Sequence, residues 1–355
     1  MAIVMLVGGL LILILGADLL VRGASSLAWS WGVAPLVVGL TVVAFGTSAP
    51  EIAVSVQASL AEQGGLALGN VIGSNLFNVL VILGLSALIA PLAVGSDLVR
   101  RDIPVLIVMS FVILLATLTG MLTIWLSWLL LLALIAYTAW LIIAGRGSGT
   151  DDGPASPRMR APLAVLAFAI GLGLLILGAD WLVTGAVSIA RDLGVSDLVI
   201  GLTIIAAGTS FPELATSAVA AARGQRDLAI GNVVGSNIFN LMAVLGAAGV
   251  VSAGGLPIPD AVRWFDLPLM AGIALLTWPL CRSGFVLNRF EGGYLLLGYL
   301  LYGLCLVQTA RLHPSAESLA LAVWLWLAAG LLGGIGDVLL HRRGRLTRST
   351  PPAER

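Results

Sequence analysis

The sequence predicts an all-α integral membrane protein with two inverted five-helix repeats, a ten-helix core and an extra C-terminal transmembrane helix. Three observations lead to this prediction: the composition, a duplicated pair of motifs, and an uneven distribution of arginine. Of the 355 residues, 59% are hydrophobic and only 10% are charged. A soluble domain of this length needs a more strongly charged surface. The composition therefore excludes an ordinary soluble protein.

Apolar runs of roughly 20 residues recur along the chain, which is the length that a helix needs to cross a bilayer core of about 30 Å. The first run lacks the positively charged start of a signal peptide, so we interpret it as a span. The Gly-, Ser- and Pro-containing stretch between the fifth and sixth runs is expected to be a linker. We expect spans at residues 3–21, 34–60, 66–92, 102–120, 123–144, 162–184, 196–222, 228–253, 265–281, 290–309 and 318–340.

Two sequence motifs occur twice. The segment GLTVVAFGTSAPE at 39–51 returns as GLTIIAAGTSFPE at 201–213, with nine of 13 positions identical and an offset of 162. The same offset relates GNVIGSNLFN at 69–78 to GNVVGSNIFN at 231–240. Because chance does not keep one register through separated blocks, the chain is an internal duplication.

The two copies are predicted to be inverted, because each has five spans and the second must therefore enter from the opposite side of the membrane. Arginine supports this: ten arginines fall in connections on one side of the core and three on the other. The positive-inside rule makes the arginine-rich side cytoplasmic and puts the N-terminus outside and the C-terminus inside. The expected divisions are a first repeat at 1–144, a cytoplasmic linker at 145–161, a second repeat at 162–310, and an extra helix with a basic cytoplasmic tail at 311–355.

Glu51 and Glu213 lie in mid-span at matching places, each directly after a proline. A charge at that depth costs roughly 2.5–3.5 kcal/mol on insertion scales and is usually functional. The proline opens one helical turn, and the freed carbonyl groups are tolerated only where they face protein, water or an ion. We expect each motif to gather carboxylate, carbonyl and hydroxyl oxygens at its helix break, the hydroxyls being those of Thr47, Ser48, Thr209 and Ser210.

The second motif adds further oxygen donors. Ser74 and Asn78 are four residues apart and so share one helix face, as do their counterparts Ser236 and Asn240. No histidine or cysteine lies in these motifs, whereas zinc, copper and nickel prefer nitrogen or sulfur. A site made only of oxygen suits calcium, which takes 6–8 oxygen ligands, and sodium can use the same donors. Two glutamates would balance one Ca²⁺ or two Na⁺.

The motifs GTSAPE at 46–51 and GTSFPE at 208–213, with the two GSN-containing segments, resemble those of the cation/calcium exchanger superfamily, in particular the prokaryotic sodium/calcium exchangers. The similarity covers about residues 1–310. It implies ten core helices and alternating access, with tilting peripheral helices. It also implies a set of ion ligands: Glu51, Glu213, Thr47, Ser48, Thr209, Ser210, Ser74, Ser236, Asn78 and Asn240, with the carbonyls of Ala44 and Ala206. Some members of the superfamily have aspartate where this chain has Asn240.

The function expected from these residues and this resemblance is secondary active antiport of calcium against sodium at a midplane oxygen site. The alternative is a proton-coupled calcium exchanger. We expect no enzymatic activity and no cofactor, with Ca²⁺ and Na⁺ as the transported ions. The expected partners are the lipid bilayer and these ions, without nucleic acid or an obligate protein partner. The expected location is the inner (plasma) membrane, which the chain crosses many times.

Simpler interpretations were weighed for the same residues. The glutamates could be buried acids satisfied by neighbours, although two symmetric acids without basic partners make a poor structural device. The Ser and Asn stripes could bond helices together without touching an ion. For Asp18 and Asp180, which recur in register, a structural contact near a span end is favoured over a ligand role. A passive channel is disfavoured because inverted repeats with broken helices point to alternating access.

Overall fold

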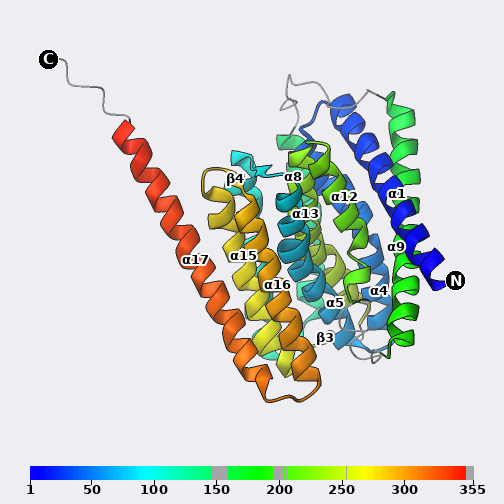
Figure 1. Ribbon diagram of the computed structural model, residues 1–355, viewed down its shortest axis with the longest axis vertical. Coiled ribbons are helices and arrows are strands. Elements are labelled where there is room, and N and C mark those ends of the chain that lie inside the picture. The colour runs from blue at the N-terminus through cyan, green and yellow to red at the C-terminus, as the bar shows by residue number, and fades with distance from the viewer. Residues whose placement is uncertain (146–158, 195–203, 205, 253, 349–355) are drawn as a thin grey trace.

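The computed structural model describes residues 1–145, 159–194, 204, 206–252 and 254–348. Nearly all of the described chain is helical, as predicted for an all-α membrane protein. The expected linker at 145–161 and the expected start of the seventh span at 196 fall mostly outside the described residues. Figure 1 shows the helices as one bundle, with the C-terminal helix along one flank and the first helix along the other.

The first repeat contains five spans, the second of which is broken. Short π-helical segments interrupt several of them. The helices of this repeat are α1 (Ala2–Trp31), α2 (Pro35–Val38), η1 (Gly39–Val43), α3 (Ala44–Thr47), α4 (Ala49–Leu60), α5 (Gly64–Phe77), η2 (Asn78–Leu83), α6 (Gly84–Ile89), η3 (Leu98–Asp102), α7 (Ile103–Ala116), η4 (Thr117–Thr119) and α8 (Ile124–Ala144).

The second repeat follows the same order in the described part of the chain. Its helices are α9 (Ala161–Asp192), α11 (Ala206–Gly208), α12 (Phe211–Ala222), α13 (Arg226–Phe239), η6 (Asn240–Val244), α14 (Leu245–Val251), η7 (Val262–Asp266), α15 (Leu267–Arg282) and α16 (Arg289–Ala310), after which α17 (Ser315–Arg348) forms the extra helix. Helix α17 packs against α15 and α16 on the outside of the core, and leans away from it toward the C-terminus (Figure 1).

Two short strand pairs confirm that the repeats are inverted. Strand β1 (Leu92–Ala93), before the fourth span, pairs antiparallel with β4 (Val286–Leu287), before the tenth. Strand β2 (Met121–Leu122), before the fifth span, pairs antiparallel with β3 (Leu256–Pro257), before the ninth. In two parallel copies these partners would lie on opposite sides of the membrane, whereas in inverted copies they lie on the same side. Each strand pair therefore joins the two repeats at one end of the bundle.

Helices α1 and α9 pack against each other along their length through glycines spaced seven residues apart. A methyl group added at Gly9 would lie 2.5 Å from the Leu182 nitrogen, and one added at Gly171 would lie 2.5 Å from the Leu20 nitrogen. Only glycine permits backbones to approach this closely. The two helices therefore form a paired unit along one flank of the bundle (Figure 1).

Both of these helices are longer than predicted, so the predicted ends at 21 and 184 were wrong. Helix α1 has 30 residues and α9 has 32, which is more than a bilayer core of about 30 Å needs, and such helices tilt. The first predicted span ended just before Arg22, but Arg22 continues the helix and its Nε lies 2.9 Å from the Asp18 carboxylate one turn earlier. Asp18 therefore lies within α1 rather than near a helix end.

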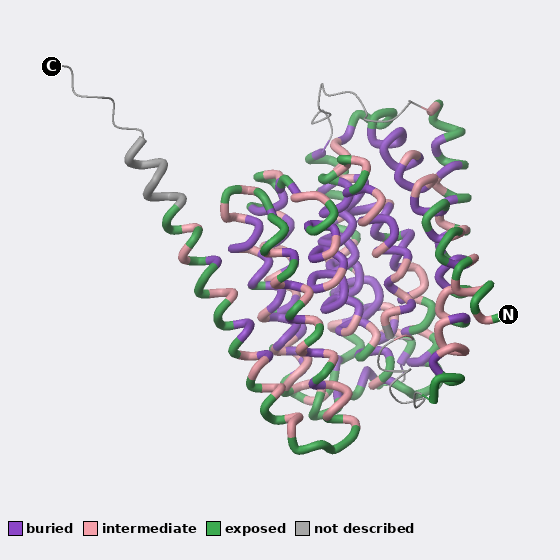
Figure 2. The backbone as a smooth tube through the Cα atoms, viewed as in Figure 1, coloured by how far each residue is buried: buried purple, intermediate pink, exposed green. Residues whose placement is uncertain are grey.

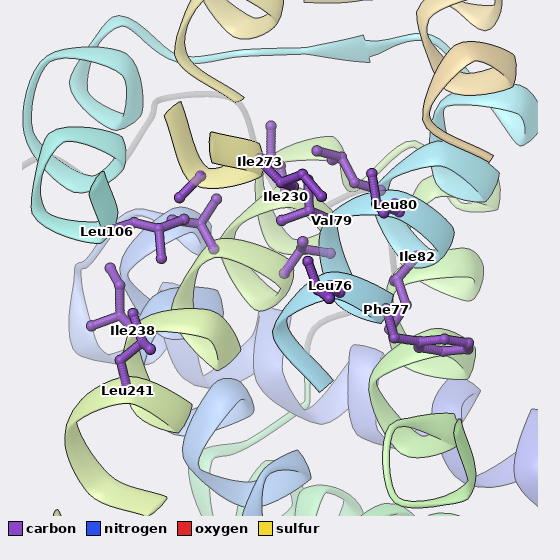
Figure 3. Close-up of a cluster of buried hydrophobic side chains, with 14 of the residues drawn as sticks. Leu76, Phe77, Val79, Leu80, Ile82, Leu106, Ile230, Ile238, Leu241 and Ile273 are labelled. Atoms are coloured by element: carbon purple, nitrogen blue, oxygen red, sulfur yellow. The ribbon is translucent and has the colours of Figure 1, made fainter. Parts of the chain in front are cut away.

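The centre of the bundle is formed by the spans that carry the second motif, α5–η2 and α13–η6. In Figure 2 the buried residues concentrate in these central helices, while the flanking helices expose residues on their outer sides. Figure 3 shows apolar side chains of both central spans, such as Leu76 and Ile238, in one cluster with Leu106 of α7 and Ile273 of α15. Apolar side chains on the outer helices are exposed and suit contact with lipid. The motifs are thus held in the most enclosed part of the molecule.

Candidate functional site

The second span is broken where the sequence predicts it. The segments Pro35–Thr47 and Ala49–Leu60 meet at an angle of 45°, and Ser48 at the junction has φ −82° and ψ 5°. The second repeat has the same junction, because Ser210 has φ −91° and ψ 6° just before α12. Each break puts a glutamate, Glu51 or Glu213, in the first turn of the following helix, where the positive end of the helix dipole favours an anion.

The two glutamates are completely buried and lie near each other through crosswise hydrogen bonds. The Ser48 hydroxyl donates to Oε1 of Glu213 over 3.1 Å, and the Ser210 hydroxyl donates to Oε1 of Glu51, also over 3.1 Å. The sequence analysis expected each motif to gather oxygens at its own helix break and both breaks to contribute to one midplane site. In the structure each carboxylate accepts a hydrogen bond from a hydroxyl of the other repeat, a pairing that the sequence analysis did not specify.

Thr47 is the last residue of α3, directly before the break at Ser48. Its hydroxyl donates to the Val43 carbonyl at 3.1 Å and approaches Oδ1 of Asn232 at 3.3 Å. Thr209 makes the equivalent contact, since its hydroxyl lies 3.4 Å from Oδ1 of Asn70. The threonines therefore face the asparagines that support the glutamates.

These two asparagines brace the helix that carries each glutamate. Asn70 donates to the Glu51 carbonyl at 3.3 Å and to the Ser55 hydroxyl at 2.9 Å. Asn232 makes the same pair of bonds, at 3.3 Å to the Glu213 carbonyl and at 2.9 Å to the Ser217 hydroxyl. The sequence analysis did not single out the two serines, although each stands four residues after a glutamate and their register could have indicated them.

Several buried polar atoms around the glutamates have no hydrogen-bond partner in the described part of the chain. An unsatisfied buried polar group costs about 1–3 kcal/mol, so a group of them in one place calls for an explanation. Most are oxygens, and they come from the motifs of both repeats. They are Oε2 of Glu51, Oε2 of Glu213, the hydroxyls of Ser74 and Ser236, Oδ1 of Asn78, and both amide atoms of Asn240.

The remaining predicted residues are the two alanines. Ala44 begins α3 in the buried part of the break, and its carbonyl accepts the Ser48 backbone N–H at 3.0 Å and lies 3.5 Å from the Thr47 hydroxyl. Ala206 begins α11 at the corresponding place. Asn78 and Asn240 each begin a π-helical segment, η2 and η6, a feature that the sequence analysis missed. Such segments are frequent at functional sites.

The donor set fits a cation that prefers oxygen. Among the described residues there is no cluster of three or more His, Cys, Asp or Glu side chains that could hold a metal by itself. The site instead combines two carboxylates with hydroxyl, amide and carbonyl oxygens, the ligands that calcium and sodium accept. Two negative charges enclosed together repel each other strongly in a medium of low dielectric, and a bound cation would offset that repulsion.

Inverted repeats that meet at a buried, charged site of broken helices define an ion-transporting membrane protein of the secondary transporter class. The comparison with known families agrees. The profile of the family described as "Sodium/calcium exchanger protein" matches residues 1–143 and 163–308. The chain therefore belongs to this family of exchangers, and it is a multi-pass cation/calcium antiporter.

Individual relatives support the assignment over most of the chain. The "putative antiporter CaxA" of Alkalimonas amylolytica is 40% identical over 304 residues, which cover 83% of this chain and 95% of the relative. The "sodium/calcium exchanger MaX1" of Methanosarcina acetivorans is 30% identical over 334 residues, and the match covers 83% of this chain and 95% of that relative. Solved structures of the sodium-calcium exchanger NCX_Mj match with a TM-score of 0.74 at 31% identity, covering 84% of this chain and 96% of that one.

Proposed function

We propose that this protein exchanges Ca²⁺ for Na⁺ by alternating access at the buried site between the two repeats. The observation that carries the proposal is the pair of glutamates: one oxygen of each accepts a hydrogen bond from a hydroxyl of the other repeat, and the other oxygen has no partner among the described residues. The proposed ligands are the side chains of Glu51, Glu213, Thr47, Ser48, Thr209, Ser210, Ser74, Asn78, Ser236 and Asn240, with the carbonyls of Ala44 and Ala206.

Charge balance explains how one site could exchange these two ions. Two carboxylates neutralise one Ca²⁺ or two Na⁺, and both ions accept oxygen ligands, so the ions compete for overlapping positions. An empty site carries two uncompensated charges and is expected to resist the switch between the two access states. Relatives named as sodium/calcium exchangers support sodium as the counter-ion.

We assign the chain to the plasma membrane, with the N-terminus outside and the arginine-rich linker and C-terminal tail in the cytoplasm. The arginine distribution supports this orientation through the positive-inside rule. We also propose, from the register of the internal repeat, that 1–144 and 162–310 are the two transporting repeats. Residues 145–161 are then the linker between them, and 311–355 are the added helix and tail.

The second candidate is a proton-coupled calcium exchanger. It is favoured by the oxygen of each buried glutamate that has no partner within the described ranges, because a proton on that oxygen could remove one charge in place of a cation. Here Asn240 leaves the site with two acidic side chains, so two protons would balance one Ca²⁺.

Radiolabelled calcium uptake into proteoliposomes separates the two candidates. One set of liposomes is loaded with sodium, and a second set is free of sodium and carries an imposed pH gradient. Uptake that follows only the outward sodium gradient supports sodium/calcium exchange, and uptake that follows only the pH gradient supports the second candidate. No uptake in either set would contradict both.

A further inference from the structure

A hydrogen bond across the two repeats fixes the amide of Asn78. The Asn78 Nδ2 donates to Oδ1 of Asn237 over 3.0 Å, and both residues are buried. Because the amide nitrogen is engaged on one side, the amide oxygen must point elsewhere, and this oxygen has no partner in the described part of the chain. It is therefore held as a free acceptor.

The inverted repeat predicts a second, equivalent bond, which is not formed among the residues that the structure describes. The counterpart of Asn78 is Asn240, and the counterpart of Asn237 is Asn75, so Asn240 should donate to Asn75. Both amide atoms of Asn240 and the Oδ1 of Asn75 are instead without partners among the described residues. The two halves of the site therefore differ at this point.

Met270 accounts for the difference. The Nδ2 of Asn75 lies 3.6 Å from the Met270 sulfur, which is a weak acceptor. In the register that matches Asp102-Ile103-Pro104 with Asp266-Leu267-Pro268, the counterpart of Met270 is Leu106, whose side chain offers no acceptor. The Met270 sulfur thus orients the amide of Asn75. Leu106, at the equivalent position in the first repeat, cannot orient the amide of Asn237 in the same way.

From these contacts we propose that Asn237 is a positioning residue, which keeps the Asn78 oxygen directed toward the transported cation, and that Asn240 lacks such an anchor. The proposal rests on the proposed function, because it assumes that a cation binds at this site. If Asn237 did not accept this bond, the Asn78 amide could turn and present its N–H groups to a cation, which repels them. The result is a site with one fixed amide ligand and one adaptable amide ligand.

The test compares the same polar-to-apolar change at two pseudo-symmetric positions, Asn237→Leu and Asn75→Leu. Calcium uptake is measured in proteoliposomes as a function of calcium concentration, giving a half-saturating concentration and a maximal rate per folded protein. Asn237→Leu is expected to raise the half-saturating concentration about tenfold with a smaller change in maximal rate. Asn75→Leu removes only the contact with sulfur and should change it less than about twofold.

Equal effects of the two substitutions, or no effect of Asn237→Leu, would overturn the proposal. If Asn237→Leu does not yield monodisperse protein, Asn237→Asp replaces it, since aspartate keeps an acceptor oxygen at the same position. Its calcium half-saturation should be no weaker than that of the unmodified chain, and a loss would contradict the positioning role. Failure of the proposed function would show separately, as absence of calcium uptake by the unmodified chain.

Discussion

At the scale of single residues, the proposed function makes its strongest prediction for substitutions of the two buried glutamates. Glu51→Gln or Glu213→Gln keeps the volume and the hydrogen bond from the serine of the other repeat but removes one of two charges. We expect calcium uptake to fall to the level of empty liposomes, because the remaining charge cannot balance a dication. Glu62→Gln, which neutralises an exposed acid in the connection after α4, is the matched control and should retain full uptake.

Normal uptake by both glutamate variants, measured with protein that elutes as a single species, would show that the glutamates are not ligands of the transported ion. Loss of uptake in Glu62→Gln as well would mean that net charge, rather than position, matters.

Asn240 is the residue at which a change of charge should be tolerated. Its amide has no hydrogen-bond partner in the described part of the chain, so Asn240→Asp removes no hydrogen bond found there and adds one acidic group. A third carboxylate raises the cation charge needed for balance and can itself take up a proton. We expect the calcium uptake curve to change its dependence on sodium or on pH, as measured by titrating each across the proteoliposome assay. Superimposable curves for the variant and the unmodified chain would show that the charge at this position does not affect exchange.

At the scale of helices and strands, two Asp–Tyr pairs, one buried and one partly buried, hold neighbouring spans together. The Tyr137 hydroxyl donates to Oδ1 of Asp102 at 3.0 Å, joining α8 to the start of the fourth span. Tyr302 makes the same bond to Asp266 at 3.1 Å, joining α16 to the start of the ninth. The bond recurs in both repeats, so it is part of the duplicated scaffold.

Tyr137→Phe should therefore destabilise the protein by about 1–3 kcal/mol, because it leaves a buried carboxyl group without its donor. The measurement is the midpoint of thermal unfolding in detergent, followed by loss of the monodisperse species. Asp102→Asn keeps an acceptor for the tyrosine hydroxyl and should lower the midpoint less. A larger loss from Asp102→Asn than from Tyr137→Phe would show that the charge of Asp102, rather than this bond, matters.

The sequence predicted which elements are equivalent better than it predicted how they face one another. The register of the repeat identified the two breaks, the glutamates and the second motif, because it depends only on residue identity. It could not show that Ser48 bonds to Glu213, since the break at Ser48 rotates the next helix by an amount that no spacing records. Nor did it show that α1 continues past Arg22, because hydropathy marks the apolar run and not the end of the helix.

At the scale of the whole molecule, the two ends of the transport route are not equivalent, although the repeats that build them are. Asp18 of α1 forms ion pairs with Arg22 and with Arg223, which caps α12. The hydroxyl of Ser25 also donates to Oε1 of Gln225 in the connection that follows. The contacts with Arg223 and Gln225 tie α1 to the core at the end of the bundle that we assign to the cytoplasm, whereas the pair with Arg22 lies within α1.

The opposite end cannot form the same network. Asp180 preserves the acid and is exposed, but the register places Thr184 where the first repeat has Arg22, and Ala61 where the second has Arg223. Partly exposed ion pairs contribute on the order of 0–1 kcal/mol each, so the network should favour a closed cytoplasmic end by roughly 1 kcal/mol. A difference of that size changes the ratio of two access states several-fold.

Removing the asymmetry should therefore change apparent affinity in opposite directions on the two sides of the membrane. Arg223→Ala installs the residue of the other repeat and is expected to lower the calcium half-saturation measured from the cytoplasmic side about threefold while raising it from the outside. Inside-out and right-side-out vesicles give the two values. Ala61→Arg, which offers a basic partner near Asp180, should have the reverse effect. A change of equal size and sign on both sides would mean that Arg223 acts on the site itself and not on the balance of states, since only a shift in that balance moves the two affinities apart.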